Sequence, residues 1–249
     1  MTPAADLAGK VAFVTGGSRG IGAAIVERLA RDGASVAFTY LTSHENAARA
    51  QARSSSLEGR SLAIHADSAD AQALEGAIAR TATTFGRLDV VVINAGLMRL
   101  GPVTELALAD FDRMMAVNVR SLFVAARAAV PYFAGNGRIV AIGSVTAMKT
   151  GFPGAAVYAA TKSAIATLAR GLAIELAPRG ITVNTIHPGP VETENNPAHG
   201  PMAEAIKNHI PLRRYGHVDE IAGMVAYLIG PEAAFVTGSA FTIDGGAMA

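Results

Sequence analysis

Short β-branched runs alternate with longer amphipathic segments along most of this 249-residue chain. Between the apolar runs, residues such as Ile21, Ile25 and Leu29 recur at the three- to four-residue spacing of a helix face. Alternating strands and helices predict a parallel sheet with right-handed crossovers and helices on both faces. The seven expected strands cover 11–15, 35–40, 61–64, 88–93, 138–142, 181–186 and 240–243.

Length and composition narrow the class of protein. The chain is 51% hydrophobic and 16% charged, against about 25% charged in an average protein, which favours a large core and excludes disorder. A net charge of +1 without a basic cluster makes nucleic acid an improbable partner. We expect one domain over 1–249, in the cytoplasm, because the N-terminus lacks the pattern of an export signal and no apolar run could span a membrane.

The absence of cysteine and the spacing of the histidines argue against several kinds of covalent and metal chemistry. The absence of cysteine rules out disulfides, thiolate metal sites and a cysteine nucleophile. The six histidines show no metal-ligand spacing, so no catalytic metal is expected.

A glycine-rich turn follows the first expected strand and opens a helical pattern. Its sequence is Thr-Gly-Gly-Ser-Arg-Gly-Ile-Gly, with glycines at 16, 17, 20 and 22. Glycine brings backbone N–H groups close to an anion, and the helix N-terminus adds its positive dipole end. A plain turn is the alternative, but the strand before it and the helix after it favour a dinucleotide site.

A tyrosine and a lysine four residues apart suggest proton transfer. On a helix, Tyr158 and Lys162 share one face, and an ammonium group beside a phenol lowers the pKa of the phenol. Most such pairs are structural, so the motif is weak alone. Ser144 follows the fifth strand, at the edge where open sheets hold ligands, and Asn118 lies in the helical stretch 114–120.

These motifs, taken in order, resemble those of the short-chain dehydrogenase/reductase family. The likeness runs from about residue 9 to 246 and includes the glycine turn, Asn94-Ala95-Gly96 and the set Asn118, Ser144, Tyr158 and Lys162. It implies a doubly wound Rossmann fold, with a seven-stranded parallel sheet in the order 3-2-1-4-5-6-7. It also implies hydride transfer between a nicotinamide cofactor and a carbonyl or alcohol.

The resemblance assigns a role to each member of the catalytic set. Tyr158 is the general acid and base, and Ser144 hydrogen-bonds the substrate oxygen. Lys162 lowers the pKa of Tyr158 and binds the nicotinamide ribose. Asn118 holds, through its backbone, a water that links Lys162 to solvent.

The cofactor is expected to be NADP(H), with NAD(H) as the alternative. The second strand ends without the carboxylate that would hold an unphosphorylated ribose, and Arg19 suits a 2′-phosphate unless it is merely a solvated loop charge. Ser68 and Ile93 depart from the usual pattern. Expected cofactor contacts are Gly16, Ser18, Arg19, Gly20, Ile21, Gly22, Tyr40, Thr42, Ser43, Asp67, Ser68, Asn94, Ala95, Gly96, Tyr158, Lys162, Pro188, Gly189, Val191 and Thr193.

The sequence restricts the substrate to a class of carbonyl or alcohol compounds and does not identify it. The overall likeness is greatest to 3-oxoacyl-[acyl-carrier-protein] reductases, but residues 130–137 lack the bases that dock an acidic carrier, although Arg179 matches a second docking position. This favours a small free ketone, aldehyde or secondary alcohol. A non-enzymatic dinucleotide sensor is a further alternative, which the intact catalytic set disfavours. The resemblance also implies a substrate-covering loop and helix at about 190–213 and a homotetramer.

Overall fold

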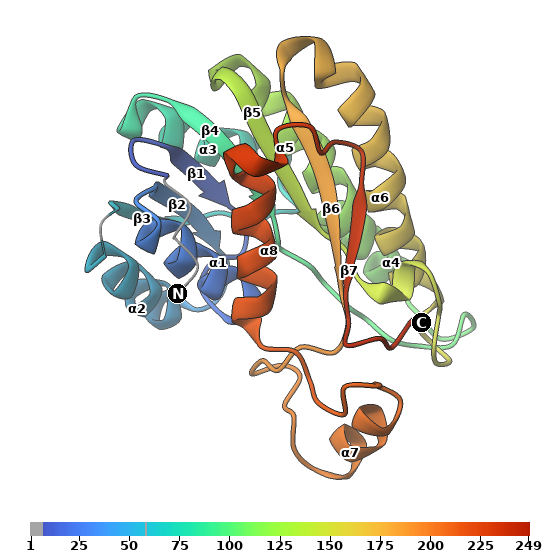
Figure 1. Ribbon diagram of the computed structural model, residues 1–249. Helices are drawn as coiled ribbons and strands as arrows, with labels where there is room; N and C mark the ends of the chain where they lie inside the picture. The colour runs from blue at the N-terminus through green and yellow to red at the C-terminus, as the bar shows by residue number, and fades with distance from the viewer. Residues whose placement is uncertain (1–6, 58) are drawn as a thin grey trace.

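The fold, taken from a computed structural model, is described for residues 7–57 and 59–249 (Figure 1). The expectation that the N-terminus carries no export signal rests partly on residues 1–6, which lie outside the described residues. The strands are β1 (Val11–Val14), β2 (Ser35–Tyr40), β3 (Ser61–His65), β4 (Leu88–Ile93), β5 (Phe133–Ile142), β6 (Thr182–Pro188) and β7 (Ala240–Ile243). The α-helices are α1 (Gly20–Arg31), α2 (His44–Ser55), α3 (Ala71–Phe85), α4 (Leu108–Met114), α5 (Ser121–Ala129), α6 (Ala156–Leu176), α7 (Pro201–Asn208) and α8 (Val218–Ile229).

The strands form one seven-stranded sheet in the order β3-β2-β1-β4-β5-β6-β7, and every neighbouring pair is parallel. This confirms the predicted fold class and strand order. Because all carboxyl ends of the strands meet at one edge, the motifs that follow β1, β2, β4, β5 and β6 are brought together there.

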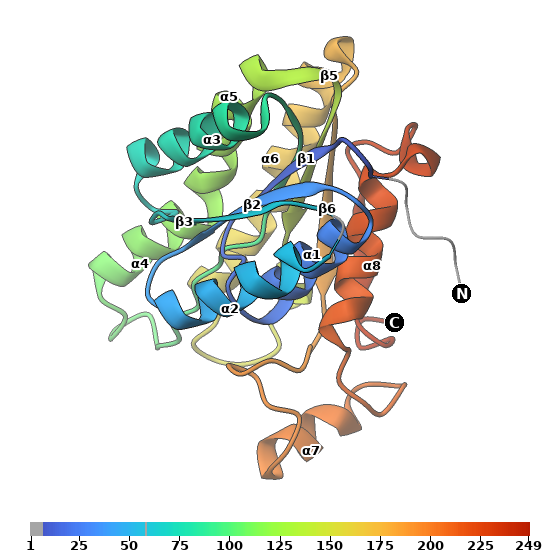
Figure 2. The ribbon, with the colours of Figure 1, turned by 90° about the vertical axis from the view of Figure 1, so that its left-hand side faces the viewer.

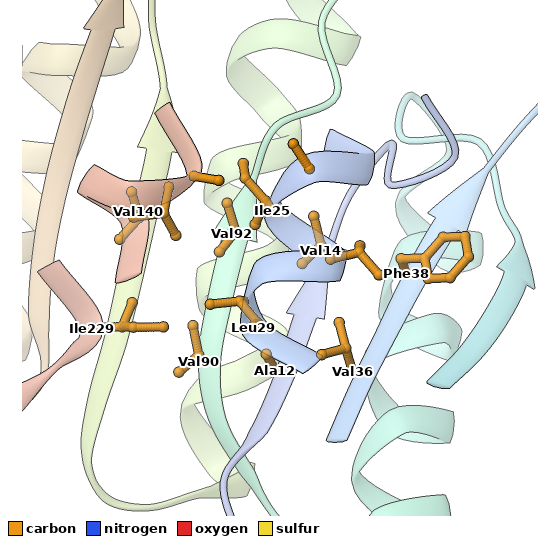
Figure 3. Close-up of a cluster of buried hydrophobic side chains, with 14 of the residues drawn as sticks. Ala12, Val14, Ile25, Leu29, Val36, Phe38, Val90, Val92, Val140 and Ile229 are labelled. Carbon is orange, nitrogen blue, oxygen red and sulfur yellow. The ribbon is translucent and has the colours of Figure 1, made fainter. Parts of the chain in front are cut away.

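Each face of the sheet has its own core, because side chains alternate along a strand. Ala12 and Val14 of β1 belong to the cluster under α1, α2 and α8, whereas Val11 and Phe13 belong to the cluster under α3, α5 and α6. Figure 2 shows these two helical layers on either side of the sheet. In Figure 3, Val14, Val90 and Val92 of the sheet lie against Ile25 and Leu29 of α1. Burial on both faces explains why the strands read as continuous apolar runs.

Two elements differ from the sequence prediction. Strand β5 begins at Phe133, five residues earlier than predicted, because its pairing with β4 includes a register shift between Leu88 and Val90. Gly135 and Asn136 have positive φ values of 99° and 49°, so a turning segment of chain interrupts the ladder. The stretch around Asn118, predicted as part of an α-helix, is instead a π-helix over Met115–Arg120 that joins α4 to α5.

The segment after β6 leaves the sheet at its carboxyl edge. In Figure 1, α7 lies beyond that edge, away from the helices that cover the two faces. The excursion closes where Val191 and Gly216 form a parallel bridge, with Glu192 N donating to Gly216 O and Gly216 N donating to Pro190 O, both at 2.9 Å. Its two ends are therefore fixed side by side.

Candidate active site

A cleft of about 960 Å³ opens at the carboxyl edge of the sheet. Its size is in the range of ligand pockets, and it lies where open α/β sheets bind ligands. Every predicted cofactor contact lines it, as do Ser144, Tyr158 and Lys162. Asn118 does not line it. The sequence motifs are therefore parts of one cleft.

The glycine turn after β1 is packed too closely for larger residues. Gly16 and Gly20 have φ values of 66° and 52°, which disfavour any side chain. A Cβ at Gly17 would lie 2.5 Å from Cβ of Phe38, and a Cβ at Gly22 would lie 2.5 Å from Nδ2 of Asn94 and would overlap the carbonyl oxygen of Gly16. The turn thus presents bare backbone at the N-terminus of α1, as an anion site requires.

Side chains of two neighbouring strands hold this turn in place. Asn94, after β4, donates from Nδ2 to the carbonyl oxygens of Thr15 and Gly16, at 3.1 and 3.0 Å. Oγ1 of Thr15 accepts the backbone N–H groups of Asn94 and Ala95, both at 3.0 Å, and Oγ1 of Thr39 in β2 accepts that of Gly16 at 3.1 Å. These bonds give Asn94 a structural role in the cleft, in addition to its predicted contact with the cofactor.

At the β2 end of the cleft lie the residues expected to bind a 2′-phosphate. Arg19 is exposed beside Thr42 and Ser43, and its guanidinium has no hydrogen bond or ion pair to another described residue. Ser43 caps α2 by accepting the N–H of Asn46 at 3.3 Å, which leaves its hydroxyl proton free to donate. The Tyr40 hydroxyl forms a 3.1 Å hydrogen bond with Nδ1 of His44.

Asp67, expected to contact the adenine, is already held by two partners. Its Oδ1 accepts the N–H of Ala69 at 2.9 Å, and its Oδ2 accepts Nη2 of Arg113 at 2.7 Å. Arg113 comes from α4 and also lines the cleft. Sequence reasoning missed Arg113, because nothing local to α4 indicates a partner 46 residues away.

Tyr158 and Ser144 meet at the floor of the cleft. Their side chains are hydrogen-bonded, which lowers the pKa of Tyr158, but burial of the phenol is the larger effect and the pKa lies above its ordinary value of 10.0. Ser144 Oγ also accepts Oγ1 of Thr146 at 2.9 Å and N of Thr146 at 3.2 Å. The phenol is therefore neutral near pH 7 and is ready to give a proton.

Lys162 lies beneath this pair, with 3% of its surface exposed. Its Nζ donates to the carbonyl oxygen of Ile142 at 2.9 Å and lies 5.8 Å from the centroid of the Tyr158 ring. Burial lowers the pKa of Lys162 to about 8. The sequence predicted that Lys162 lowers the pKa of Tyr158. In the protein without cofactor that pKa is raised instead, because both groups are desolvated and the Lys162 ammonium donates to a backbone carbonyl.

Asn118 uses its side chain to hold the β4–α4 loop. Oδ1 accepts the N–H of Leu97, and Nδ2 donates to the carbonyl oxygen of Leu97, both at 2.8 Å. Nδ2 also donates to Oγ1 of Thr161 at 2.9 Å. The side chain thus acts as a brace, and the predicted role of its backbone stays a prediction.

The stretch after β6 forms another wall of the cleft. Gly189 N donates to Ile243 O at 2.9 Å, and a Cβ on Gly189 would lie 2.7 Å from Cα of Asp244. The Thr193 methyl group approaches Gly20, since a Cβ there would be 3.3 Å from it. Thr193 therefore lies over the start of α1.

The described residues contain neither a metal-binding cluster nor a membrane-spanning helix. Within 7–57 and 59–249, no group of three or more His, Asp or Glu side chains is arranged to hold a metal ion. No helix in the same ranges has the length and apolar character needed to cross a membrane.

Known proteins resemble the chain over nearly its full length. A family model described as enoyl-(acyl carrier protein) reductase matches residues 16–248. The cyclic-di-GMP-binding biofilm dispersal mediator protein of Escherichia coli is 44% identical over 95% of this chain and 96% of its own. A short-chain dehydrogenase/reductase from Serratia marcescens is 53% identical, with a TM-score of 0.96 over 98% of this chain and all of that one. A short-chain dehydrogenase from Burkholderia cenocepacia, solved with NADP, is 48% identical, with the same TM-score and coverage.

The fold, the order of the motifs and these likenesses agree. The strand order is the one that the sequence resemblance implied, and the glycine turn and the Ser144, Tyr158 and Lys162 side chains share one cleft. The chain belongs to the short-chain dehydrogenase/reductase family of oxidoreductases.

Proposed function

We propose that this protein is an NADP(H)-dependent oxidoreductase that interconverts a ketone or aldehyde and the corresponding alcohol. The observation that carries the proposal is the meeting of Tyr158, Ser144 and Lys162 in the cleft that the glycine turn also lines. A site for binding alone has no need for a buried phenol beside a buried ammonium. The same groups serve both directions of the reaction.

The residues fit a dinucleotide. The glycine positions of the turn, 16, 17, 20 and 22, have no room for a side chain, and the turn leaves backbone donors at a helix N-terminus. Arg19, whose guanidinium has no protein partner among the described residues, would bind a 2′-phosphate, and Ser43 lines the same cleft. This supports NADP(H), which the Burkholderia protein was solved with, over NAD(H). A bound nicotinamide would supply and accept the hydride.

Each member of the catalytic set has a distinct task. Tyr158, neutral because burial raises its pKa, gives a proton to the carbonyl oxygen as the alcohol forms. Ser144 donates a hydrogen bond to the same oxygen and stabilises its developing negative charge. Lys162, fixed at the carbonyl oxygen of Ile142, holds the ribose hydroxyls and returns a proton toward Tyr158. Asn118 holds, through its backbone, the water that links Lys162 to solvent.

The substrate that we favour is a small free carbonyl compound. Near the expected carrier-docking surface, Arg138 Nη1 donates to the carbonyl oxygen of Asn136 at 2.7 Å, and Arg179 Nη2 donates to that of Val130 at 2.8 Å. These bonds leave the positive charge of each guanidinium in place, and it is the absence of bases in residues 130–137 that weakens the attraction for an acidic carrier. A 3-oxoacyl-[acyl-carrier-protein] is the alternative substrate.

We also propose the domain organisation, the segment that covers the substrate, and the oligomeric state. The chain works as one domain over 1–249, and the segment at about 190–213, which carries α7, covers the substrate. Its ends are fixed together at Val191 and Gly216, and Leu212 N donates to Gly245 O at 3.1 Å, so its C-terminal part is anchored next to the cleft. As the family resemblance implies, we propose a homotetramer.

A dinucleotide sensor is the second candidate, and the Escherichia coli relative favours it, since that protein is named for binding cyclic di-GMP. Calorimetric titration with NADPH and with cyclic di-GMP separates the two. Binding of NADPH unaffected by cyclic di-GMP supports the enzyme. Tight binding of cyclic di-GMP without turnover of any carbonyl compound supports the sensor.

The main test measures NADPH oxidation with simple ketones, diketones and acetoacetyl thioesters, in the intact protein and in Tyr158→Phe. The variant should bind NADPH normally, because only one hydroxyl is removed, and should lose at least about 100-fold in kcat. Turnover unchanged in Tyr158→Phe contradicts the assigned chemistry. A preference for the thioesters favours the carrier-dependent alternative.

A further inference from the structure

One buried histidine lies directly behind Ser144 and has no place in the mechanism above. His187, near the end of β6, is 2% exposed, and its Nδ1 accepts the backbone N–H of Ser144 at 3.1 Å. Since Nδ1 accepts, the ring proton of the neutral imidazole is on Nε2. The imidazole therefore has a defined tautomer.

The histidine continues the β5–β6 ladder after its backbone pairing ends. The last paired residues are Ile142 and Ile186, and Gly143 N then donates to Ile186 O at 2.6 Å. The next N–H, that of Ser144, has no strand carbonyl to meet, and the imidazole nitrogen takes that place. A buried N–H without an acceptor would be costly. His187 thus fixes the backbone that carries the Ser144 hydroxyl.

The neighbouring glycine makes room for this ring. A Cβ on Gly143 would overlap Nδ1 of His187 and would lie 2.7 Å from its Cε1. Gly143 does not have a positive φ, so glycine is required there for space and not for backbone conformation. Gly143 and His187 are therefore complementary.

The surroundings of the ring keep it uncharged. Burial lowers the pKa of His187, and the positive charges of Lys162 and Arg170, both on α6, lower it further. Protonation of Nδ1 would place one N–H against another and would add a positive charge near Lys162. The Ser144 backbone would then lose its support.

We propose that His187 is a positioning residue that sets the orientation of Ser144, and that its protonation disables the site at acid pH. This inference rests on the proposed function, because its effect is exerted on the hydroxyl that binds the substrate oxygen. His187 acts through Ser144 and contacts no reacting atom.

Two variants test the proposal. In His187→Asn, the amide oxygen can take the place of Nδ1 but does not titrate. In His187→Leu, the side chain has similar volume and cannot accept. We expect His187→Leu to lower kcat roughly tenfold and to leave KM for NADPH unchanged. This loss is smaller than the loss of about 100-fold or more that follows removal of an oxyanion donor, because Ser144 is displaced and not removed. Because the pKa of His187 is lowered, wild-type kcat should fall only at a pH below the ordinary histidine pKa of about 6.5. His187→Asn should keep most of the kcat and lose this fall.

A measurement without substrate keeps the inference independent of the reaction. The ¹⁵N shifts of the His187 ring should show the Nε2–H tautomer at pH 7, and the Ser144 amide should exchange with solvent faster in His187→Leu than in His187→Asn. Wild-type protein without turnover but with these shifts would contradict the proposed function alone. An active enzyme whose two variants have the same kcat and the same pH profile, or a ring protonated at pH 7, would overturn the role of His187.

Discussion

The side chain of Asn118 and the backbone of Leu97 exchange a reciprocal pair of hydrogen bonds, each 2.8 Å long. The side-chain amide of Asn118 thereby makes the two hydrogen bonds that the backbone of a neighbouring strand would make. It fixes the loop that follows β4, and part of this loop lines the cleft. Asn118 is 1% exposed, so water cannot replace these bonds. A residue expected from sequence to serve the chemistry through its backbone thus holds the architecture through its side chain.

Replacing this brace should cost stability as well as activity. In Asn118→Ala, the part-buried N–H and carbonyl of Leu97 lose their partners, as does the hydroxyl of Thr161, so the free energy of unfolding should fall by about 3 kcal/mol. Urea unfolding measures this. Thr161→Val leaves the pair with Leu97 intact and removes the third bond of Asn118, together with the bond that Thr161 Oγ1 donates to the carbonyl oxygen of Tyr158 at 2.7 Å, so it should cost about 1–2 kcal/mol. Equal, small losses in both variants would show that the pair with Leu97 contributes little.

Alanine substitution should be harmful at a glycine of the turn and stabilising at a glycine in an open helical position. A Cβ at Gly22 would overlap the carbonyl oxygen of Gly16, so Gly22→Ala should distort the turn and weaken NADPH binding by at least about tenfold, equivalent to 1.4 kcal/mol. Gly76→Ala in α3 is the control, because a Cβ there meets nothing within 4 Å, and it should raise the free energy of unfolding by about 0.5–1 kcal/mol. Fluorescence titration with NADPH and urea unfolding measure the two effects.

The buried charge of Lys162 should lower the free energy of unfolding of the protein. Its pKa of about 8, against 10.5 in water, means that burying the charge costs about 3 kcal/mol at pH 7. Lys162→Met should remove that cost but leave the carbonyl oxygen of Ile142 unpaired, for a net gain of about 1–2 kcal/mol in cofactor-free protein, with turnover lost.

The sign of the pH dependence of that gain follows from the direction of the shift. A lowered pKa means that the unfolded chain binds more protons between about pH 8 and 10.5, so wild-type stability recovers as the pH rises through this range. The difference between Lys162→Met and wild type, measured by urea unfolding at pH 7 and pH 10, should therefore narrow. A difference that stays constant with pH would exclude a buried charge as its cause.

The choice between the two nicotinamide cofactors should depend on Arg19. Loss of a charge-assisted contact with a 2′-phosphate costs about 1.5–3 kcal/mol. Arg19→Ala should therefore raise KM for NADPH at least about tenfold and leave KM for NADH unchanged. Arg31→Ala, which removes an exposed arginine at the far end of α1, is the control. An equal rise in KM for both cofactors in Arg19→Ala would mean that Arg19 does not distinguish them.

The raised pKa of Tyr158 should appear as a directional pH profile. Since burial favours the neutral phenol, carbonyl reduction needs no prior ionisation, and its kcat should stay flat from about pH 6.5 to 8. Alcohol oxidation needs the phenolate, so its kcat should rise steadily with pH over the same range and beyond. Initial rates in each direction with saturating substrates measure this, and an oxidation rate independent of pH would contradict a Tyr158 base.

The fold and most of the cleft follow from patterns local in sequence. Strand and helix periodicity, together with the resemblance, predicted the sheet order, and every expected cofactor contact lines one cleft. This succeeds because parallel topology by itself gathers the carboxyl ends of the strands. The start of β5 at Phe133 was not predicted, since the apolar β-branched run that marks this strand begins only after Gly137.

What the tertiary structure alone decided concerns pairs distant in the chain and groups whose chemistry depends on burial. The ion pair of Arg113 with Asp67 and the bond of Ser144 with His187 join residues with no common motif. The sequence determined that a phenol and an amine four residues apart lie together on one helix face, because helix geometry is local. It could not determine that the pKa of Tyr158 is raised, since desolvation is the sum of everything packed around a group.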